Sequence, residues 1–279
     1  MGGFRLFNQR YLKKHFHTLS LFRESFQPAE LGGDSSVVIY ANHASWWDPL
    51  LAMYLADSQF GDFRMYAPID SEAFEKYRMF GKMGFYPVDQ ASLEGAGNFL
   101  RISRRILQEP GNTIWVTPEG RFCDARDHSA ELMPGVGHLA HKIASQAKRS
   151  ERSTATIHSD AENRDNSTDH RVGFLPLAVE YAFWEERTPE ILVNFGSPIW
   201  TNSSELQGFD KSQWNEKLTD SLRQTQTNLA AASIARDSSL FHPLLKSQSG
   251  TFFVYDWWRA ATNRLRGKTF DSEHSEQFK

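Results

Sequence analysis

The sequence is almost free of cysteine and has no long apolar run. Its one cysteine, Cys123, excludes an internal disulfide and fits a reducing compartment. No stretch approaches the roughly 18 apolar residues of a membrane-spanning helix, and residues 1–12 lack the uncharged apolar core of a signal peptide. With 31 basic and 34 acidic residues the net charge is −3, which gives no attraction for nucleic acid. If this protein acts on lipids, we expect it to lie on a membrane rather than across it.

The chain is long enough for one large α/β domain or two small ones. Residues 37–40 and 113–116 are continuous apolar runs, typical of strands that are buried on both faces. Further strands are expected at residues 63–67, 85–88, 173–180 and 191–195, and helices at residues 49–56, 71–80, 92–108 and 135–147. This alternation predicts an α/β fold with a central sheet flanked by helices.

The N-terminal segment, residues 1–30, differs in character from the main domain at residues 31–279. Residues 4–23 carry five Lys or Arg and no acid, with aromatic residues and leucines at roughly helical spacing. This pattern predicts a basic amphipathic helix that lies in a membrane interface. The same stripe would also suit a helix that packs on the domain.

Two further segments interrupt the α/β pattern. Residues 148–171 contain no aromatic residue and many polar ones, so they bury too little to offset the entropy of ordering, and we expect a mobile surface insertion. Residues 250–270 combine aromatic and basic residues, which suits a lipid headgroup region. A last helix held on the core by its tryptophans is an equally good interpretation.

The first candidate site is the string NHASWWD at residues 42–48, directly after a buried strand. His43 and Asp48 are five residues apart, so on a straight helix their side chains would point about 140° apart. The backbone must turn if they are to meet. Pro49 favours this, because it disfavours helix at Asp48 and suits the first position of a helix. We expect His43 at a strand end and Asp48 as the cap of the next helix, with the turn folding one onto the other.

An aspartate bonded to one imidazole nitrogen fixes the tautomer and leaves the other nitrogen as a base. Such a base can take the proton from an attacking hydroxyl, and no serine or cysteine nucleophile is needed. His43 and Asp48 would equally suit a loop histidine and a plain helix cap. Trp46 and Trp47, inside the string, either line a substrate groove or anchor the core.

The second candidate site is the string VTPEGR at residues 116–121, at the end of another expected strand. A strand that runs into Pro-Glu-Gly and then a cation suits a site at the carboxyl edge of an open sheet. Gly120 permits close approach of the backbone, whose N–H could help to hold an oxyanion. The alternative is a simple turn with a solvated Arg121.

These blocks, with two others, resemble those of the lysophosphatidic-acid acyltransferase family within the glycerolipid acyltransferases. The family's Asn-His-x-x-x-x-Asp block corresponds to residues 42–48, its Gly-x-x-Phe-Ile-x-Arg block to residues 81–89, its Pro-Glu-Gly-Thr-Arg-Ser block to residues 118–121 and its apolar-Pro-apolar strand to residues 174–178. The resemblance spans roughly residues 37–198 and keeps the order and spacing of the blocks.

The resemblance implies an enzyme that transfers a fatty acyl group from acyl-CoA or acyl-carrier protein to a lipid, with His43 as general base and Asp48 as its partner. It implies no cofactor beyond that donor, and as partners the donor and a membrane lipid surface, on the cytoplasmic, inner face. The residues that it places near substrate are Asn42, Trp46, Trp47, Gly84, Phe85, Asp89, Glu119, Gly120 and Arg121.

The sequence departs from the family pattern where the family binds a phosphate. The arginine that ends the second block is Asp89 here, and a lysine usual upstream corresponds to Asp70. Arg121 comes one place early, with Phe122 where the family has its cation. Carboxylates in place of cations repel a phosphate dianion. We therefore expect an acceptor other than lysophosphatidic acid, such as a glycolipid or terpenoid hydroxyl or an aminolipid, for which Asp70 or Asp89 could bind a sugar hydroxyl or an ammonium group. Both are also ordinary turn residues.

Other chemistries have weaker support in the sequence. Cys123 has no adjacent His or Lys to activate it as a nucleophile. His138 and His141 lack the glutamate motif of a zinc site, so we expect no catalytic metal. The remaining alternatives are a lipid hydrolase or transacylase that uses the same dyad, and a lipid- or carrier-binding module without catalysis.

Overall fold

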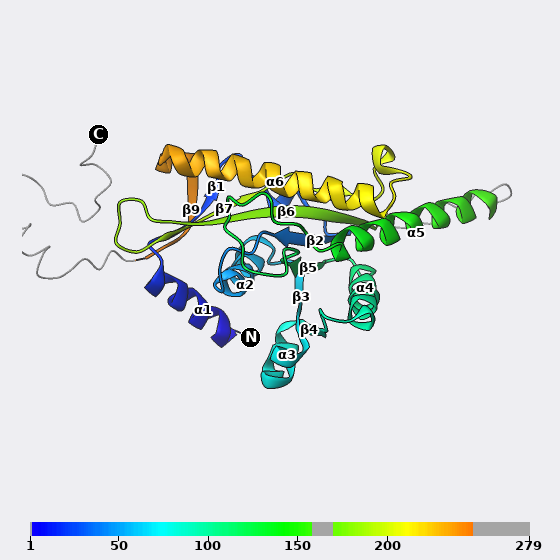
Figure 1. The fold of residues 1–279 in the computed structure, drawn as a ribbon, viewed down its shortest axis with the longest axis horizontal. Helices are drawn as coiled ribbons and strands as arrows, with labels where there is room; N and C mark the ends of the chain where they lie inside the picture. Colours follow the sequence, from blue (N-terminus) through cyan, green and yellow to red (C-terminus); the bar gives the residue numbers. More distant parts are fainter. Residues whose placement is uncertain (1, 158–169, 248–279) are drawn as a thin grey trace, which may run out of the picture.

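The computed structural model describes residues 2–157 and 170–247 (Figure 1). Within them a nine-stranded sheet has the order β4-β3-β5-β2-β6-β7-β1-β9, with β8 paired to β6. The strands are β1 (Thr18–Phe22), β2 (Ser35–Ala41), β3 (Arg64–Asp70), β4 (Phe85–Val88), β5 (Asn112–Val116), β6 (Arg171–Ala182), β7 (Glu190–Phe195), β8 (Ile199–Trp200) and β9 (Phe241–Lys246). The run from β4 to β6 is parallel, and β7 and β9 are each antiparallel to a neighbour.

Helices cover both faces of the sheet. They are α1 (Gly2–His15), α2 (Asp48–Gln59), α3 (Ser71–Lys76), α4 (Leu93–Leu107), α5 (Gly135–Ile157) and α6 (Lys211–Ala235). In Figure 1, α6 runs along β6 on one side of the sheet, and α1 and α2 lie on the other. Short 3-10 turns occur at Pro28–Glu30, Arg78–Met83, Ser204–Leu206 and Ser238–Leu240.

The core consists of layers on the two faces of β2. Val37 and Ile39 join Leu51 and Leu55 of α2 in one buried cluster. Val38 and Tyr40 belong to another cluster, with residues of α4, α5 and α6. All four of these β2 side chains are fully buried. Burial on both faces of β2 therefore accounts for the continuous apolar run at residues 37–40, as expected, and the prediction of an α/β fold is confirmed.

The N-terminal prediction is wrong for its second half. Residues 18–22 form β1, a fully buried strand that pairs with β7 and β9, rather than the end of a helix. Leu19 and Leu21 are buried in the sheet, and a strand between two others buries this segment on both faces, which a helix at a membrane interface would not. Within residues 4–23, the helical part is the part that belongs to α1, and α1 contacts α2.

The second half of the chain also differs from expectation. α5 continues to Ile157, so residues 148–157 are helical instead of part of an insertion. Residues 158–169 and the aromatic and basic segment at residues 250–270 lie outside the described residues.

α6 was not expected, because its surface is rich in polar residues. It begins with a capping box between Asp210 and Gln213, and a buried stripe of Trp214, Leu218, Leu222 and Leu229 holds it on the sheet.

Candidate active site

The turn between β2 and α2 brings the two residues of the predicted dyad together. The N–H of Asp48 donates to the carbonyl of Ser45 at 3.0 Å, which closes the turn. Pro49 follows within the first turn of α2. Trp47 occupies the cap position and Asp48 is the first helical residue, so the expectation that Asp48 caps the helix is wrong. Its carboxylate points back to His43 instead.

Three donors surround the carboxylate of Asp48. Oδ2 lies 2.7 Å from Nδ1 of His43 and accepts the N–H of Ser45 at 3.0 Å. Oδ1 accepts the hydroxyl of Tyr181 at 2.6 Å. The Asp48 side chain is only 6% exposed, against 19% for His43. Because a carboxylate only accepts hydrogen bonds, the proton of the imidazole belongs on Nδ1, which leaves Nε2 with a free lone pair.

The loop after β5 fixes the backbone of His43 from both sides. β5 and β2 are parallel neighbours, so their carboxyl ends lie next to each other. Oε2 of Glu119 accepts the N–H of His43 at 2.7 Å. The N–H of Cys123 donates to the carbonyl of His43 at 2.9 Å. The two strings found in the sequence are therefore joined directly.

Glu119 is in turn held by α6. Its Oε1 lies 3.0 Å from Nη1 of Arg223, in a pair whose side chains are 1% and 11% exposed. The same Nη1 donates to Gln226 at 2.7 Å, and the other Nη donates to the carbonyl of Ala130. Gln226 donates to the carbonyl of Ala125 at 2.8 Å. α6 thus stabilises the loop that carries Glu119.

Tyr181 and Arg223 were missed by the sequence analysis because neither belongs to a local motif. They reach the site from β6 and α6, more than 100 residues along the chain from their partners. A polar residue in the buried stripe of α6 was one signal of a contact with the site. Gln226 comes four residues after Leu222, at a position where the helical spacing predicts an apolar side chain, and it is buried.

Aromatic side chains flank the dyad. The ring of Phe122 lies 4.5 Å from that of His43, between centroids, and Phe122 is largely exposed. Trp46 is exposed, whereas Trp47 packs against Tyr11 of α1 at 5.4 Å. Trp47 is therefore an anchor for α1, and Trp46 and Phe122 are the aromatic residues that face outwards near His43.

Two residues expected near substrate are instead buried parts of the scaffold. Asn42 is 1% exposed, and its amide makes both hydrogen bonds to the backbone of Val179, at 2.8 and 3.0 Å. These bonds continue the pairing of β2 with β6. Glu119 is likewise occupied by His43 and Arg223. Both residues orient the dyad from within the protein.

Gly120 has a structural reason to be glycine. Its φ is +65°, and a Cβ there would lie 2.5 Å from Sδ of Met133. Its N–H donates to the carbonyl of Thr117 at 3.1 Å. That N–H is engaged in the turn, and an oxyanion donor elsewhere on the backbone of this loop stays a prediction. The side chain of Arg121 is exposed.

The second block lies farther along the same edge of the sheet. β4 is three strands from β2, or about 14 Å at ordinary strand spacing. Gly84 has φ +92°, and a Cβ there would collide with the carbonyl of Met65, while Phe85 packs on Phe80 at 5.3 Å, so both residues shape the β3–β4 pair.

The two aspartates near this block cap local turns. Asp70 accepts the N–H groups of Glu72 and Ala73 at the start of α3. Asp89 accepts the N–H of Ala91 at 2.9 Å. Hydrogen bonds from Ser92 and Ala91 lower the pKa of Asp89. These contacts favour the interpretation of both as turn residues.

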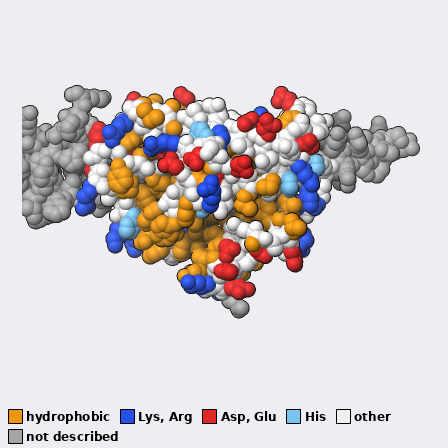
Figure 2. Space-filling model, viewed as in Figure 1, with side chains coloured by type: hydrophobic (Ala, Val, Ile, Leu, Met, Phe, Trp, Pro, Cys, Tyr) orange, Lys and Arg blue, Asp and Glu red, His pale blue; other side chains and the backbone are white. Residues whose placement is uncertain are grey.

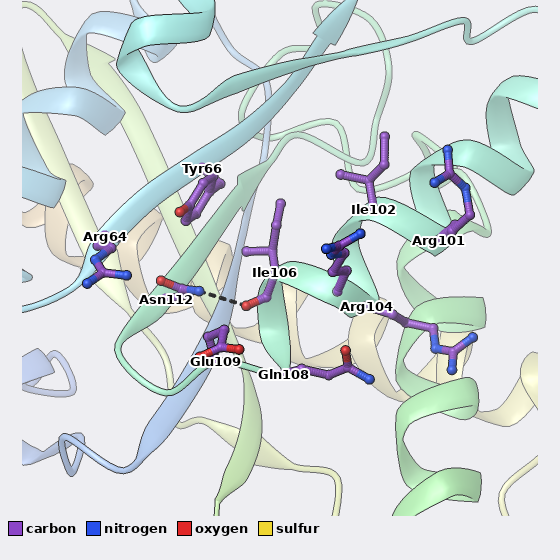
Figure 3. A pocket seen from close by; sticks show the side chains of 10 residues that line it. Arg64, Tyr66, Arg101, Ile102, Arg104, Ile106, Gln108, Glu109 and Asn112 are labelled. Carbon is purple, nitrogen blue, oxygen red and sulfur yellow. Dashed lines mark hydrogen bonds between the residues drawn. The ribbon is translucent and has the colours of Figure 1, made fainter.

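A cavity of about 940 Å³ lies away from the dyad (Figure 3). Its lining includes Arg64 and Asn112, at the amino ends of β3 and β5, and the C-terminal half of α4. The side-chain amide of Asn112 donates to the carbonyl of Ile106 at 2.8 Å. His43 follows the carboxyl end of β2, at the opposite edge of the parallel sheet, so this cavity does not surround the dyad.

Cys123 is buried, and both its burial and the nearby charge of Glu119 raise the pKa of its thiol. The described residues include no group of three or more His, Cys, Asp or Glu placed to hold a metal ion. In the same part of the chain, every helix is too short or too polar to cross a bilayer.

Comparisons with known proteins identify the family and a similar fold. The family model described as Acyltransferase matches residues 13–158, more than half of the chain. No curated protein matches the chain. Among solved structures, the chain is similar to the 1-acyl-sn-glycerophosphate (LPA) acyltransferase PlsC from Thermotoga maritima, with a TM-score of 0.51 and 12% identity, over 82% of this chain and 79% of that one. At this identity the likeness concerns the fold alone.

Proposed function

The chain belongs to the acyltransferase family, and we propose that it moves a fatty acyl group from acyl-CoA or acyl-carrier protein to a hydroxyl or amine of a lipid, with His43 as general base. The observation that carries this proposal is the 2.7 Å contact between Nδ1 of His43 and the buried carboxylate of Asp48. That contact directs the free nitrogen of the imidazole towards a substrate.

The reaction follows from this arrangement. Nε2 of His43 takes the proton of the acceptor hydroxyl as its oxygen attacks the thioester carbonyl. The tetrahedral intermediate collapses, the carbon–sulfur bond breaks, and the thiolate takes the proton back from His43. Asp48 stabilises the imidazolium between these steps. An ester and a free thiol result, and no covalent enzyme intermediate is required.

A lipid surface is the partner that the exposed side chains support. In the described part of the chain ten large apolar residues are exposed, and eight of them lie on α1 or in segments that follow the carboxyl ends of β2, β3, β4 and β5. This apolar rim consists of Leu6, Phe7, Trp46, Tyr77, Met79, Leu93, Phe122 and Met133. Figure 2 shows apolar side chains gathered over α1 and α2. An exposed apolar surface of this kind suits a membrane.

The charge of α1 supports the same partner. Arg10, Lys13 and Lys14 are exposed, and α1 contains no acidic residue. Stacked rings connect α1 to the catalytic turn, from Phe7 through Tyr11 to Trp47. A helix with basic and aromatic side chains binds at the headgroup level of anionic lipids. It would hold the dyad close to lipid acceptors, with the protein peripheral on the cytoplasmic, inner face.

The acceptor proposed here carries no phosphate monoester. Asp70 and Asp89 stand where the resemblance calls for cations, and Phe122 lies on the ring of His43 at the third such position. Two carboxylates repel a dianion, and an aromatic ring offers it no hydrogen bond. A neutral or zwitterionic acceptor avoids both costs.

The experiment is acyl transfer from labelled acyl-CoA or acyl-carrier protein to a panel of lipid acceptors, with His43→Ala as the inactive control. We expect a labelled lipid from the wild type only, and slower reaction with lysophosphatidic acid than with neutral or zwitterionic acceptors. Faster reaction with lysophosphatidic acid would refute the acceptor proposal alone. Thioester consumption without acylated lipid would indicate a hydrolase, and vesicle binding without turnover of either donor would indicate a binding module.

A further inference from the structure

We propose that Tyr181 is a positioning residue for this reaction, because its hydroxyl holds the carboxylate of Asp48 in the orientation that His43 requires. The inference rests on the proposed function, since it assigns Tyr181 a role only through the dyad. The carrying observation is the 2.6 Å hydrogen bond from the Tyr181 hydroxyl to Oδ1 of Asp48.

Tyr181 is the donor that ties Asp48 to the rest of the fold. The other two donors, Nδ1 of His43 and the N–H of Ser45, both belong to the same short turn as Asp48 and both contact Oδ2. The backbone of His43 is itself held by Glu119 and Cys123, but its side chain and the N–H of Ser45 hold Oδ2 and leave Oδ1 to another donor. Among the hydrogen-bond donors of the described residues, only Tyr181 reaches Oδ1, and it comes from β6 in the middle of the sheet.

Asp48 also has a competing place for its carboxylate. It is the first residue of α2, where the positive end of the helix attracts a carboxylate. In this turn Pro49 has no N–H, and the N–H groups of Asp48 and Leu51 already donate to Ser45 and Trp47, so the N–H of Leu50 is the competing donor. The hydroxyl of Tyr181 and the turn together favour the opposite direction, towards His43. Without Tyr181, Oδ1 would lose its partner and the capping position would become more favourable.

The fold delivers Tyr181 to this place through Asn42. The amide of Asn42 holds both backbone groups of Val179, at 2.8 and 3.0 Å, and so fixes the register of β6 against the end of β2. Tyr181 is two residues farther along β6 and therefore on the same face as Val179. The ring of Phe16 packs on Tyr181 at 5.7 Å and on Trp47 at 4.9 Å. Ring and hydroxyl are thus both held.

The phenol of Tyr181 remains a hydrogen-bond donor throughout the pH range in which acyl transfer would be measured. Burial first, and then the adjacent charge of Asp48, raise the pKa of Tyr181 well above its usual value. A hydroxyl that keeps its proton can only donate to a carboxylate. It therefore stabilises Asp48 as an anion while His43 carries the extra proton, and it opposes transfer of the Nδ1 proton to Asp48.

The test compares Tyr181→Phe with Tyr54→Phe. Tyr54 lies on α2, the helix that Asp48 begins, and its hydroxyl donates to the carbonyl of Leu244 at 2.8 Å, away from the dyad. Each substitution removes one hydroxyl and one hydrogen bond, and Tyr181→Phe should lower the melting temperature more, because its bond is to a carboxylate. We expect Tyr181→Phe to lower kcat by about ten- to a hundredfold with little change in KM, the size expected for one bond to a charged group. Tyr54→Phe should keep the wild-type kcat.

The pH profile separates positioning from general weakening. The charged groups around His43 are Asp48 and the Glu119–Arg223 pair. Removal of the Tyr181 hydroxyl lets the carboxylate of Asp48 turn away from His43, so the imidazolium loses its anionic partner. The acid limb of kcat/KM for Tyr181→Phe should therefore move to lower pH than in the wild type and in Tyr54→Phe.

Two results would overturn the inference. One is a kcat for Tyr181→Phe equal to that of Tyr54→Phe, and the other is a lower kcat with an unmoved acid limb. Either result with an active wild type and an inactive His43→Ala would remove the role of Tyr181 and leave the proposed function intact. A wild type without acyl transfer, or an active His43→Ala, would instead refute the proposed function.

Discussion

Arg223 on α6 and Glu119 after β5 form a buried ion pair, with 3.0 Å between Nη1 and Oε1. The pair matters to the site because the other oxygen of Glu119 accepts the N–H of His43 at 2.7 Å. A residue far from every motif thus helps to fix the backbone of His43. Loss of this ion pair should therefore affect both the stability of the protein and the placement of His43.

Substitution of Arg223 by Met should destabilise the protein by roughly 3–5 kcal/mol, because Glu119 would keep a buried charge without its partner. Urea denaturation measures this. The control is Arg5→Met, which breaks the pair with Asp57 at 2.7 Å, where the side chains are 59% and 35% exposed. That change should cost less than about 1 kcal/mol.

The double variant Arg223→Met/Glu119→Gln distinguishes an unpaired charge from lost packing. The neutral amide removes the buried charge, so the double variant should be more stable than Arg223→Met alone. Equal stability of the single and double variants would mean that the charge of Glu119 is not what the arginine compensates.

Asp48→Asn should lower kcat by roughly 10²–10⁴-fold at nearly unchanged KM. An amide has one oxygen, so it cannot accept from His43, Ser45 and Tyr181 as the carboxylate does. If its NH₂ faces Nδ1, the imidazole proton moves to Nε2 and the base is lost. Steady-state kinetics with the preferred acceptor measures this. Activity within twofold of the wild type would exclude the dyad.

Two glycines of α4 provide a matched stability test. A Cβ at Gly95 would lie 1.8 Å from the carbonyl oxygen of Asp89, a backbone atom that cannot swing away, whereas a Cβ at Gly97 meets nothing within 4 Å. We expect Gly95→Ala to shift the β4–α4 connection and cost at least about 1–3 kcal/mol. Gly97→Ala should be stabilising by about 0.4–1 kcal/mol. Thermal unfolding measures the stability of both variants. Equal losses of stability in the two would contradict this geometry.

The sequence predicted the parallel half of the fold well because its signals there are local. Residues 37–40 are apolar on both strand faces, and Pro49 marks the start of α2, so β2 and the following helix could be assigned without tertiary information. β1 was mistaken for helix because five residues are too few to separate strand from helical spacing. Its assignment depends on β7 and β9, which flank it.

The candidate site likewise has a part that the sequence could predict and a part that it could not. The contact between His43 and Asp48 was predictable, because both residues lie in one short turn with a proline that fixes its shape. The burial of Asn42 and Glu119 was not, because it depends on Val179 and Arg223, which reach them from distant strands and helices. Sequence reasoning therefore named the right segments but assigned to substrate binding two side chains that the fold itself uses.

Cys123→Ser should retain most acyl-transfer activity. The pKa of the thiol is raised by burial and by the charge of Glu119, so little thiolate forms near neutral pH, and thiolate is the nucleophilic form. Alkylation by iodoacetamide should accordingly be slow at neutral pH and accelerate only above the ordinary pKa of a thiol. Loss of all activity in a folded Cys123→Ser protein would point to a covalent acyl-enzyme mechanism instead of direct attack by the acceptor.

Removal of part of the apolar rim should weaken membrane binding without damage to the chemistry. Leu6 and Phe7 on α1 are 48% and 56% exposed, and the double change to Ser removes two side chains that a bilayer would bury. Each is worth about 0.75–1.5 kcal/mol when half of it is newly buried, so the loss of both should lower partition into anionic vesicles roughly 10- to 100-fold. Phe183→Ser/Ile234→Ser is the matched control, because both residues are more exposed but lie outside the rim. Sedimentation with vesicles measures binding, and turnover of a short-chain, water-soluble acceptor should remain at the wild-type rate. Equal loss of binding in the two double variants would mean that exposure alone, and not the catalytic edge, determines how the protein meets lipid.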